Sequence, residues 1–131
     1  MKITKNFSKS EFECNCGCEM PEDVFENIKE LAVNLQYIRE YLNEPIKLTN
    51  AYRCVEHNKS KAVGGAKNSQ HILGKAADIQ IQTLTPNIVA DLIEDFIDKK
   101  YIAEGAVGRY HSFTHYDIRG TKARWNKTNL N

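Results

Sequence analysis

The sequence predicts an α+β fold: one small domain in which helices pack on a mostly antiparallel sheet. Apolar residues recur every three or four positions in residues 21–42 and 85–100, the period of a helix with one buried face. Residues 46–52, 76–82 and 106–119 instead alternate between apolar and polar, which is typical of half-buried strands. Helices interleaved with short strands, without an internal repeat, favour helices gathered against one sheet.

The composition is that of a folded protein, with 41% hydrophobic and 27% charged residues in a chain of 131. A net charge of +1 argues against a nucleic-acid partner bound through a large basic surface. No apolar run approaches the roughly 20 residues that span a bilayer, and residues 1–7 lack the apolar region of a signal peptide. We therefore expect a single monomeric domain over residues 1–131, synthesised in the cytoplasm.

A lead-in segment, residues 1–20, combines a helix start with a group of cysteines. Ser8 and Glu11 have the spacing of a capping box, which predicts a short helix that carries Phe12 inward. Four thiols allow two disulfides, a structural metal site or reduced cysteines, and the missing export signal makes stable disulfides the less natural choice. No neighbouring residue looks able to activate a thiolate, so we place these cysteines outside the active site. They are Cys14, Cys16, Cys18 and Cys54.

Both long helices are marked at their starts as well as by their period. Pro21, followed by two acidic residues, begins the first helix, and Thr85 with Pro86 begins the second. A shorter helix is expected within residues 54–62, and residues 120–131 are expected to form a polar tail. The apolar stripes are predicted core: Val24, Ile28, Leu31, Leu35, Ile38 and Leu42, then Ile88, Val89, Leu92, Ile93, Phe96 and Ile97.

Candidate metal ligands lie in two short stretches, residues 68–78 and 115–119, which hold two of the four histidines. His71 and Asp78 stand on either side of Gly74, where the chain can reverse, so their side chains can converge. His115 and Asp117 are two apart on a predicted strand and therefore face the same side of the sheet. Two histidines and one carboxylate suit zinc while a fourth position stays open for water, and Asp117 could then orient a ligand. The alternative is an ordinary polar turn and a polar strand face.

The order of these residues resembles the zinc signature of the D-alanyl-D-alanine carboxypeptidase family of murein metallopeptidases. The resemblance covers nearly the whole chain and implies the small α+β fold shared with the hedgehog signalling domain. Its N-terminal part is similar to that of small phage and prophage members. The matching residues are Phe7-Ser8-x-x-Glu11-Phe12, Thr49-Asn50-Ala51-Tyr52-Arg53, Asn58, Val63-Gly64-Gly65-Ala66, Ser69-x-His71-x-x-Gly74-x-Ala76-x-Asp78 and His115-x-Asp117-x-Arg119-Gly120.

The resemblance implies roles for several residues. It implies that His71, Asp78 and His115 bind zinc, and that Arg53 holds a substrate carboxylate or polarises the scissile carbonyl. The implied substrate is the stem peptide of peptidoglycan, cut between its two terminal D-alanines or at an internal or bridging bond. Arginine suits this work because its planar guanidinium pairs with carboxylates through two hydrogen bonds. Ser69 is expected either to support ligand or substrate binding or to cap the turn.

The sequence departs from the family at the general base. Many members carry Glu or Asp three to six residues before the last zinc histidine, where this chain has Arg109, Tyr110, His111 and Ser112. His111 is the candidate substitute because an imidazole exchanges protons near neutral pH. It could equally be a turn histidine, with Asp117 as the base. A form that binds zinc without catalysis is the remaining alternative.

The sequence as a whole predicts a zinc-dependent peptidase that acts on peptidoglycan stem peptides, with one catalytic zinc ion and a second, structural ion if the cysteines bind one. An endolysin-like enzyme of a phage or prophage, released through a holin, is the expected setting. The alternatives are a D-Ala-D-Ala carboxypeptidase of wall remodelling and an inactive zinc-containing binding module.

Overall fold

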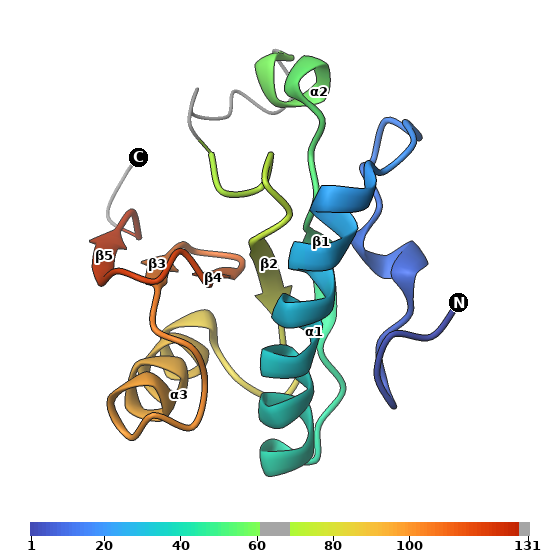
Figure 1. The fold of residues 1–131 in the computed structure, drawn as a ribbon. Coiled ribbons are helices and arrows are strands. Elements are labelled where there is room, and N and C mark those ends of the chain that lie inside the picture. The colour runs from blue at the N-terminus through green and yellow to red at the C-terminus, as the bar shows by residue number, and fades with distance from the viewer. Residues whose placement is uncertain (61–68, 129–131) are drawn as a thin grey trace.

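The computed structural model of the chain describes residues 1–60 and 69–128, so the predicted Val63-Gly64-Gly65-Ala66 motif lies outside the described residues. Within them, helices alternate with short strands as the α+β prediction requires (Figure 1). The elements are η1 (Lys9–Phe12), α1 (Glu22–Leu42), β1 (Lys47–Asn50), α2 (Val55–Lys59), β2 (Ala76–Gln80), α3 (Pro86–Asp98), β3 (Ala106–Arg109), β4 (Thr114–Asp117) and β5 (Ala123–Asn126).

The strands form one sheet in the order β1-β2-β4-β3-β5, antiparallel except for the parallel pair β3 and β5. In this register Asp78 lies directly opposite His115, and His115 lies opposite Gly108. Trp125 pairs with Gly108 from the other side. Because side chains alternate along each strand, Asp78, His115 and Trp125 share one face of the sheet.

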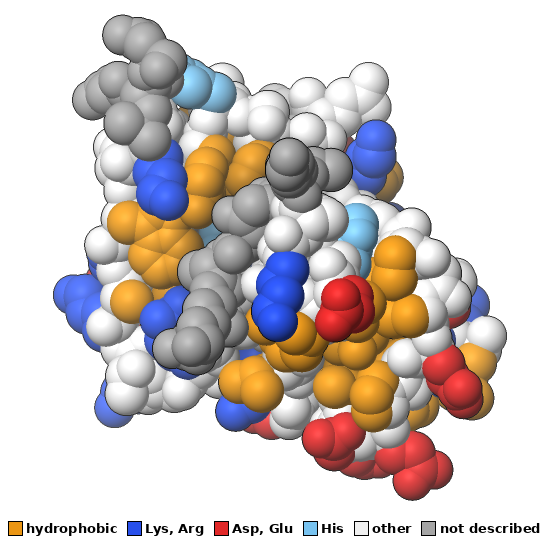
Figure 2. All heavy atoms as spheres, turned by 90° about the horizontal axis from the view of Figure 1, so that it is seen from above, with side chains coloured by type: hydrophobic (Ala, Val, Ile, Leu, Met, Phe, Trp, Pro, Cys, Tyr) orange, Lys and Arg blue, Asp and Glu red, His pale blue; other side chains and the backbone are white. Residues whose placement is uncertain are grey.

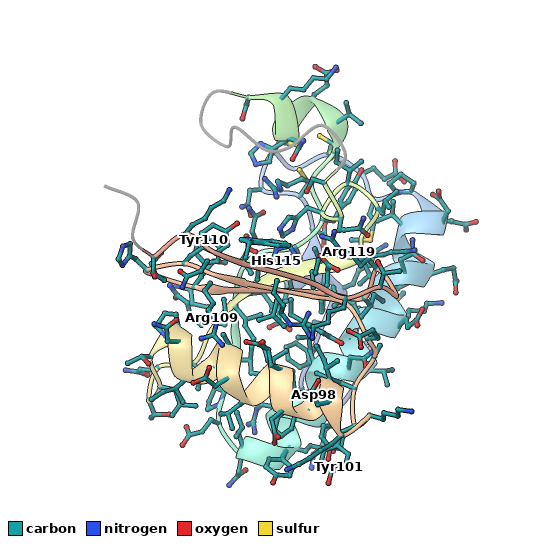
Figure 3. All side chains as sticks on the ribbon, turned by 90° about the vertical axis from the view of Figure 1, so that its left-hand side faces the viewer. Asp98, Tyr101, Arg109, Tyr110, His115 and Arg119 are labelled. Atoms are coloured by element: carbon teal, nitrogen blue, oxygen red, sulfur yellow. The ribbon has the colours of Figure 1, made fainter. Side chains whose placement is uncertain are left out.

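The other face of the sheet packs against the helices. Ile79, Val107 and Tyr116 point into a core that also contains the buried stripes of α1 and α3. The two helices meet where Phe96 contacts the rings of Tyr37 and Tyr41. Figure 3 shows α3 on one side of the sheet and the labelled Tyr110, His115 and Arg119 on the other. The helices therefore support the sheet from behind and leave its other face for the site.

The helix predictions hold with one exception. The stripe of α1 is buried from Val24 to Ile38, and Asn43 ends the helix in the left-handed conformation. In α3, the Oγ1 atom of Thr85 accepts a hydrogen bond from the backbone N–H of Ile88, as an N-cap residue does. Ile88 was predicted to be core but is exposed, because it lies in the first helical turn beyond the edge of the core. None of the described helices could span a membrane.

Both ends of the chain are packed onto this framework. The Glu11 carboxylate accepts a hydrogen bond of 2.7 Å from the Ser8 backbone N–H, and Phe12 is completely buried, as the capping box predicted. At the other end, the segment predicted as a polar tail contains β5, which sequence reasoning missed. The indole of Trp125 lies flat over Gly108, where a Cβ atom would come within 2.4 Å of the ring nitrogen. A glycine at position 108 is what allows this contact.

Candidate metal centre

A tight turn over residues 69–74 presents His71 to the sheet. The turn is closed by backbone hydrogen bonds, including one from Ile72 N–H to the carbonyl of Ser69. Gly74 ends it at a φ of +75°, and a Cβ atom there would lie 2.7 Å from the Cγ1 atom of Val24 on α1. Only glycine fits both the backbone conformation and the approach to the helix. The reversal at Gly74 predicted from the sequence is thus present.

The imidazole of His71 has one nitrogen engaged and one directed at Asp78. Its Nδ1 atom lies 2.7 Å from the carbonyl oxygen of Ala51, to which it can only donate. Its Nε2 atom lies 3.3 Å from Oδ1 of Asp78, on the side where a cation would be held. The backbone of residue 51 therefore fixes the tautomer of a candidate metal ligand.

His115 completes the cluster from the adjacent strand. Its Nδ1 atom lies 3.1 Å from the same Oδ1 atom of Asp78. The ligand atoms of His71, Asp78 and His115 all lie within 4.8 Å of one another, and all three residues are buried. The structure thus brings together the three residues that the sequence predicted as metal ligands, which we call the His–Asp–His cluster.

Asp117 and Arg119 lie behind His115. The Nε2 atom of His115 is 2.7 Å from Oδ2 of Asp117. Arg119 donates two side-chain hydrogen bonds to the Asp117 carboxylate, at 2.8 and 2.9 Å, and the backbone N–H of Ala106 adds a third. Arg119 and Asp117 therefore form an ion pair. Asp117 has no exposed side-chain surface and accepts hydrogen bonds at both oxygens, an arrangement that suits orienting His115.

Electrostatics keeps both carboxylates ionised. Burial raises the pKa of Asp78, but hydrogen bonds from His115 and His71 outweigh burial and lower it to about 2. Burial also opposes ionisation of Asp117, yet its bonds to His115 and Arg119 hold its pKa well below the usual range. For His115, burial lowers the pKa, while hydrogen bonds to Asp117 and Asp78 prevail and raise it. Two buried carboxylates beside two imidazoles form an environment that attracts a cation.

The donor set fits zinc in type and in surroundings. Zinc binds imidazole nitrogen and carboxylate oxygen, and sites with three protein ligands leave one position open. The second nitrogen of each zinc-bound histidine is commonly held by a carbonyl or a carboxylate. Here Ala51 supplies the carbonyl for His71, and Asp117 supplies the carboxylate for His115.

Arg53 lies beside the His–Asp–His cluster. Its backbone N–H donates to the carbonyl of His71 at 3.0 Å, and its Nη2 atom makes a long hydrogen bond of 3.4 Å to Oγ of Ser69. The same hydroxyl accepts the backbone N–H of His71 at 3.1 Å, so Ser69 both caps the turn and contacts the arginine. Burial lowers the pKa of Arg53, opposed by the charge of Asp78. Its Nε atom is buried and has no hydrogen-bond partner among the described residues.

His111 is not brought together with the cluster. It is exposed in the turn between β3 and β4 and lines a surface hollow next to the start of α3. Among the residues that line this hollow with it are Pro86, Asn87 and Tyr110, and none belongs to the His–Asp–His cluster. Arg109, in the window where related enzymes carry an acid, points to α3 and pairs with Asp91 and Glu94 (Figure 3).

Two aromatic residues, Tyr110 and Trp125, lie near the cluster. The ring of Trp125 lies 5.0 Å from that of His115, and its Nε1 atom donates to the hydroxyl of Tyr110 at 2.9 Å. The guanidinium of Arg119 lies 5.6 Å from the Trp125 ring. We call Tyr110 and Trp125 the aromatic wall. The alternation in residues 123–126, with Trp125 among polar neighbours, was the signal that could have indicated this strand.

The four cysteines form a second cluster. The Sγ atoms of Cys14, Cys16, Cys18 and Cys54 lie within 4.8 Å of one another, and all four are free thiols. Cys54 folds back onto the lead-in segment, as a shared site requires. Within residues 1–60 and 69–128 there are therefore two compact groups of side chains that could hold a metal ion, one buried at the sheet and one of partly exposed cysteines.

A sheet backed by helices, with two histidines and an aspartate converging on its open face, defines an α+β domain built around a candidate metal site. A family profile described as Peptidase M15 matches residues 5–117, and the chain belongs to this family. The resemblance noted in the sequence is thereby confirmed, and membership supports a zinc-dependent metallopeptidase. Comparison with the curated proteins finds no match.

Proposed function

We propose that this protein hydrolyses peptide bonds in the stem peptides of peptidoglycan, with zinc held by His71, Asp78 and His115. The observation that carries the proposal is the convergence of these three ligand atoms within 4.8 Å, beside a buried arginine whose Nε atom has no hydrogen-bond partner in the part of the chain that the structure describes. The three ligand residues suit the activation of a water molecule by a bound zinc ion, and Arg53 suits the recognition of an anionic peptide.

The histidines are prepared for a cation by the groups behind them. His71 offers Nε2 because Nδ1 donates to Ala51, and His115 offers Nδ1 because Nε2 faces Asp117. When bound at such a site, zinc lowers the pKa of a water molecule towards about 7 and polarises a carbonyl oxygen. The protein supplies fixed donors and a largely buried setting, in which charges interact more strongly than in water.

Arg53 is the proposed substrate-binding residue, with Ser69 as its support. A guanidinium that is largely removed from water but incompletely paired gains free energy when a carboxylate replaces its missing partner. Stem peptides carry such carboxylates at their C-terminus and on side chains. Figure 2 looks down on this end of the molecule and shows Lys, Arg and His side chains around its middle, with an acidic side chain close to the central basic ones and more Asp and Glu towards the lower edge.

We propose that a residue in the turn between β3 and β4 transfers protons during peptide-bond hydrolysis. His111 is exposed there and makes no hydrogen bond or ion pair within the described residues, so its imidazole is available to exchange protons. The Tyr110 hydroxyl, held by Trp125, is a second candidate for contacting the reacting carbonyl. Asp117 is proposed as a positioning residue because both of its oxygens already accept hydrogen bonds.

The decisive experiment compares two substrates under zinc-replete conditions. Purified protein is incubated with cross-linked sacculi and, separately, with a pentapeptide that ends in D-Ala-D-Ala, and products are analysed by mass spectrometry. Solubilised cross-linked peptides indicate an endopeptidase, whereas free D-alanine indicates a carboxypeptidase. Asp78→Asn should abolish either activity, while Asp95→Asn, on the exposed face of α3, serves as the matched control. A zinc-loaded parent that cleaves neither substrate would support the binding module instead.

For the biological role we propose cell-wall lysis of the endolysin type, with release through a holin, on the strength of the resemblance to small phage and prophage members. Efficient cleavage of intact sacculi supports this role. Preference for the soluble pentapeptide favours the second candidate, a D-Ala-D-Ala carboxypeptidase of wall remodelling.

A further inference from the structure

The cysteine cluster has the dimensions of a tetrahedral metal site. A zinc ion bonded to four sulfurs at about 2.3 Å separates them by about 3.8 Å. The Sγ atom of Cys54 lies 3.9 Å from that of Cys14 and 3.5 Å from that of Cys16, while Cys14 and Cys16 are 3.2 Å apart. A disulfide requires about 2.05 Å. The printed separations are thus close to those of zinc ligands and too long for a disulfide, and the Cys18 sulfur lies within 4.8 Å of the other three.

Local backbone geometry produces this gathering. Gly17 has a φ of +83°, and its N–H donates to the carbonyl of Cys14 at 3.0 Å. This turn lets Cys14, Cys16 and Cys18 direct three sulfurs to one side within five residues. Cys54 arrives from the other direction as the N-cap residue of α2.

Backbone donors are also aimed at the sulfurs. The N–H of Cys54 lies 3.5 Å from the Cys14 sulfur, and the N–H of His57 lies 3.4 Å from the Cys54 sulfur. Such donors stabilise the negative charge of a thiolate and orient it, as groups around metal ligands do. Four sulfurs with supporting N–H groups match the ligand set of closed, structural zinc sites, which leave no position for water.

From this geometry we propose a second, structural zinc site formed by Cys14, Cys16, Cys18 and Cys54, separate from the His–Asp–His cluster. Binding of Zn²⁺ displaces the thiol protons into solvent and involves no change of oxidation state. The site joins the lead-in segment to the chain that follows β1.

The location gives this ion a positioning task. Residues 51–54 form hydrogen bonds alternately to the lead-in segment and to the turn that contains His71. Tyr52 N–H donates to the carbonyl of Phe12 and Cys54 N–H to the Cys14 sulfur, both in the lead-in segment. The intervening Arg53 N–H donates to His71, on the other side. An ion bound by the cysteines would hold residues 51–54 against the lead-in segment. It would thereby also fix the position of Arg53, whose backbone bonds to His71 on the other side.

The number of zinc ions tests the site independently of peptidase activity. The full chain is purified under reducing conditions, and zinc is counted by mass spectrometry of the metal. The parent should carry close to two ions per chain, Asp78→Ala one, and Cys16→Ser fewer than the parent by one. Cys16 is exposed, so its replacement leaves the core intact. Because Asp78→Ala removes only the other ion, failure of this proposal and failure of the proposed function give different counts.

Two further measurements guard against a variant that misfolds. Titration of the folded parent with an organomercurial, which captures thiolates, should release one zinc ion and leave the other. Cobalt substituted into Asp78→Ala should give the intense near-ultraviolet band of thiolate-to-metal charge transfer. Release of no zinc by the mercurial, or a cobalt spectrum without that band, would overturn the proposal. So would a mass lower by two hydrogen atoms per cysteine pair in the freshly purified, unreduced chain, because it would show disulfides.

Ligand replacement separates metal binding from packing. Histidine can replace cysteine in zinc sites, so Cys16→His should restore the second ion that Cys16→Ser loses. In the active enzyme, Cys16→Ser should raise KM more than it lowers kcat because Arg53 loses its support, and Cys16→His should reverse the change. If both variants keep the zinc count of the parent, position 16 is not a ligand.

Discussion

The Nε2 atom of His115 lies 2.7 Å from Oδ2 of Asp117, a carboxylate with no exposed side-chain surface. The contact leaves Nδ1 of the same imidazole directed at Asp78. Asp117 in turn is held by Arg119 through two hydrogen bonds. The orientation of one proposed zinc ligand therefore depends on an ion pair that never touches the metal, which makes the pair a sensitive test of the site.

Replacing Asp117 with Asn should weaken zinc binding while keeping the fold. The amide retains the shape of the side chain but loses the charge that favours the correct His115 tautomer, and loss of such partners typically costs about 10- to 100-fold in metal affinity. Affinity is measured by competition with a chromogenic chelator. Asp95→Asn, which removes an exposed carboxylate from α3, is the control and should bind zinc as the parent does. Equal affinities in the two variants would show that Asp117 does not position His115.

Most of the His–Asp–His cluster could be predicted from the sequence because all but one of the inferences used only residues close together in the chain. His71 and Asp78 flank a single reversal at Gly74, and His115 and Asp117 follow the two-residue period of a strand. Those rules require no knowledge of distant contacts. The pairing of Asp78 with His115 was the only long-range step, and the resemblance to a known family supplied it.

What sequence reasoning missed depends on distant contacts. The strand β5 is short and paired in parallel with β3, so the brief alternation of Ala123 and Trp125 with polar residues is only a weak local signal. The indole of Trp125 packs on Gly108, and this contact is possible only because residue 108 has no side chain. Likewise no local pattern in the sequence shows that Cys54 lies close to the cysteines of the lead-in segment.

Arg53 should act on substrate binding more than on turnover. Loss of a hydrogen-bonded charge pair costs about 1.5–3 kcal/mol, which corresponds to about 10- to 100-fold in affinity. For Arg53→Gln we therefore expect KM for a stem peptide to rise by about that factor, with a smaller effect on kcat and unchanged zinc content. Arg39→Gln, near the end of α1, is the matched control. A fall in kcat alone would instead assign Arg53 to stabilising the reacting carbonyl.

The aromatic wall should report directly on the His–Asp–His cluster, because Trp125 is the only tryptophan in the chain. Its ring lies 5.0 Å from His115, so a paramagnetic ion such as Co²⁺ bound there should quench its fluorescence.

Gly108→Ala should move the indole of Trp125, since the new methyl group would overlap the ring, and should lower stability by about 1–3 kcal/mol. Thermal unfolding and emission spectra measure both effects. Unchanged emission in Gly108→Ala would contradict the packing described here.

The proton-transfer residue can be assigned by comparing His111→Ala with Tyr110→Phe. General acid–base catalysis contributes about 10²- to 10⁴-fold, so loss of the true base should lower kcat by that order with zinc content unchanged. His57→Ala controls for the loss of a histidine outside the cluster. Tyr110→Phe removes only a hydroxyl whose partner is Trp125, and we expect a smaller loss.

The pH profile adds a second criterion to this comparison. An imidazole base must be neutral to accept a proton, so kcat in the parent should fall on the acidic side of the pH profile if a histidine is the base. His111→Ala should remove that acidic limb, whereas Tyr110→Phe should retain it. If His111→Ala keeps both the rate and the acidic limb, the turn histidine has no catalytic part. A large loss in Tyr110→Phe would then move the reacting group to the aromatic wall, next to His115.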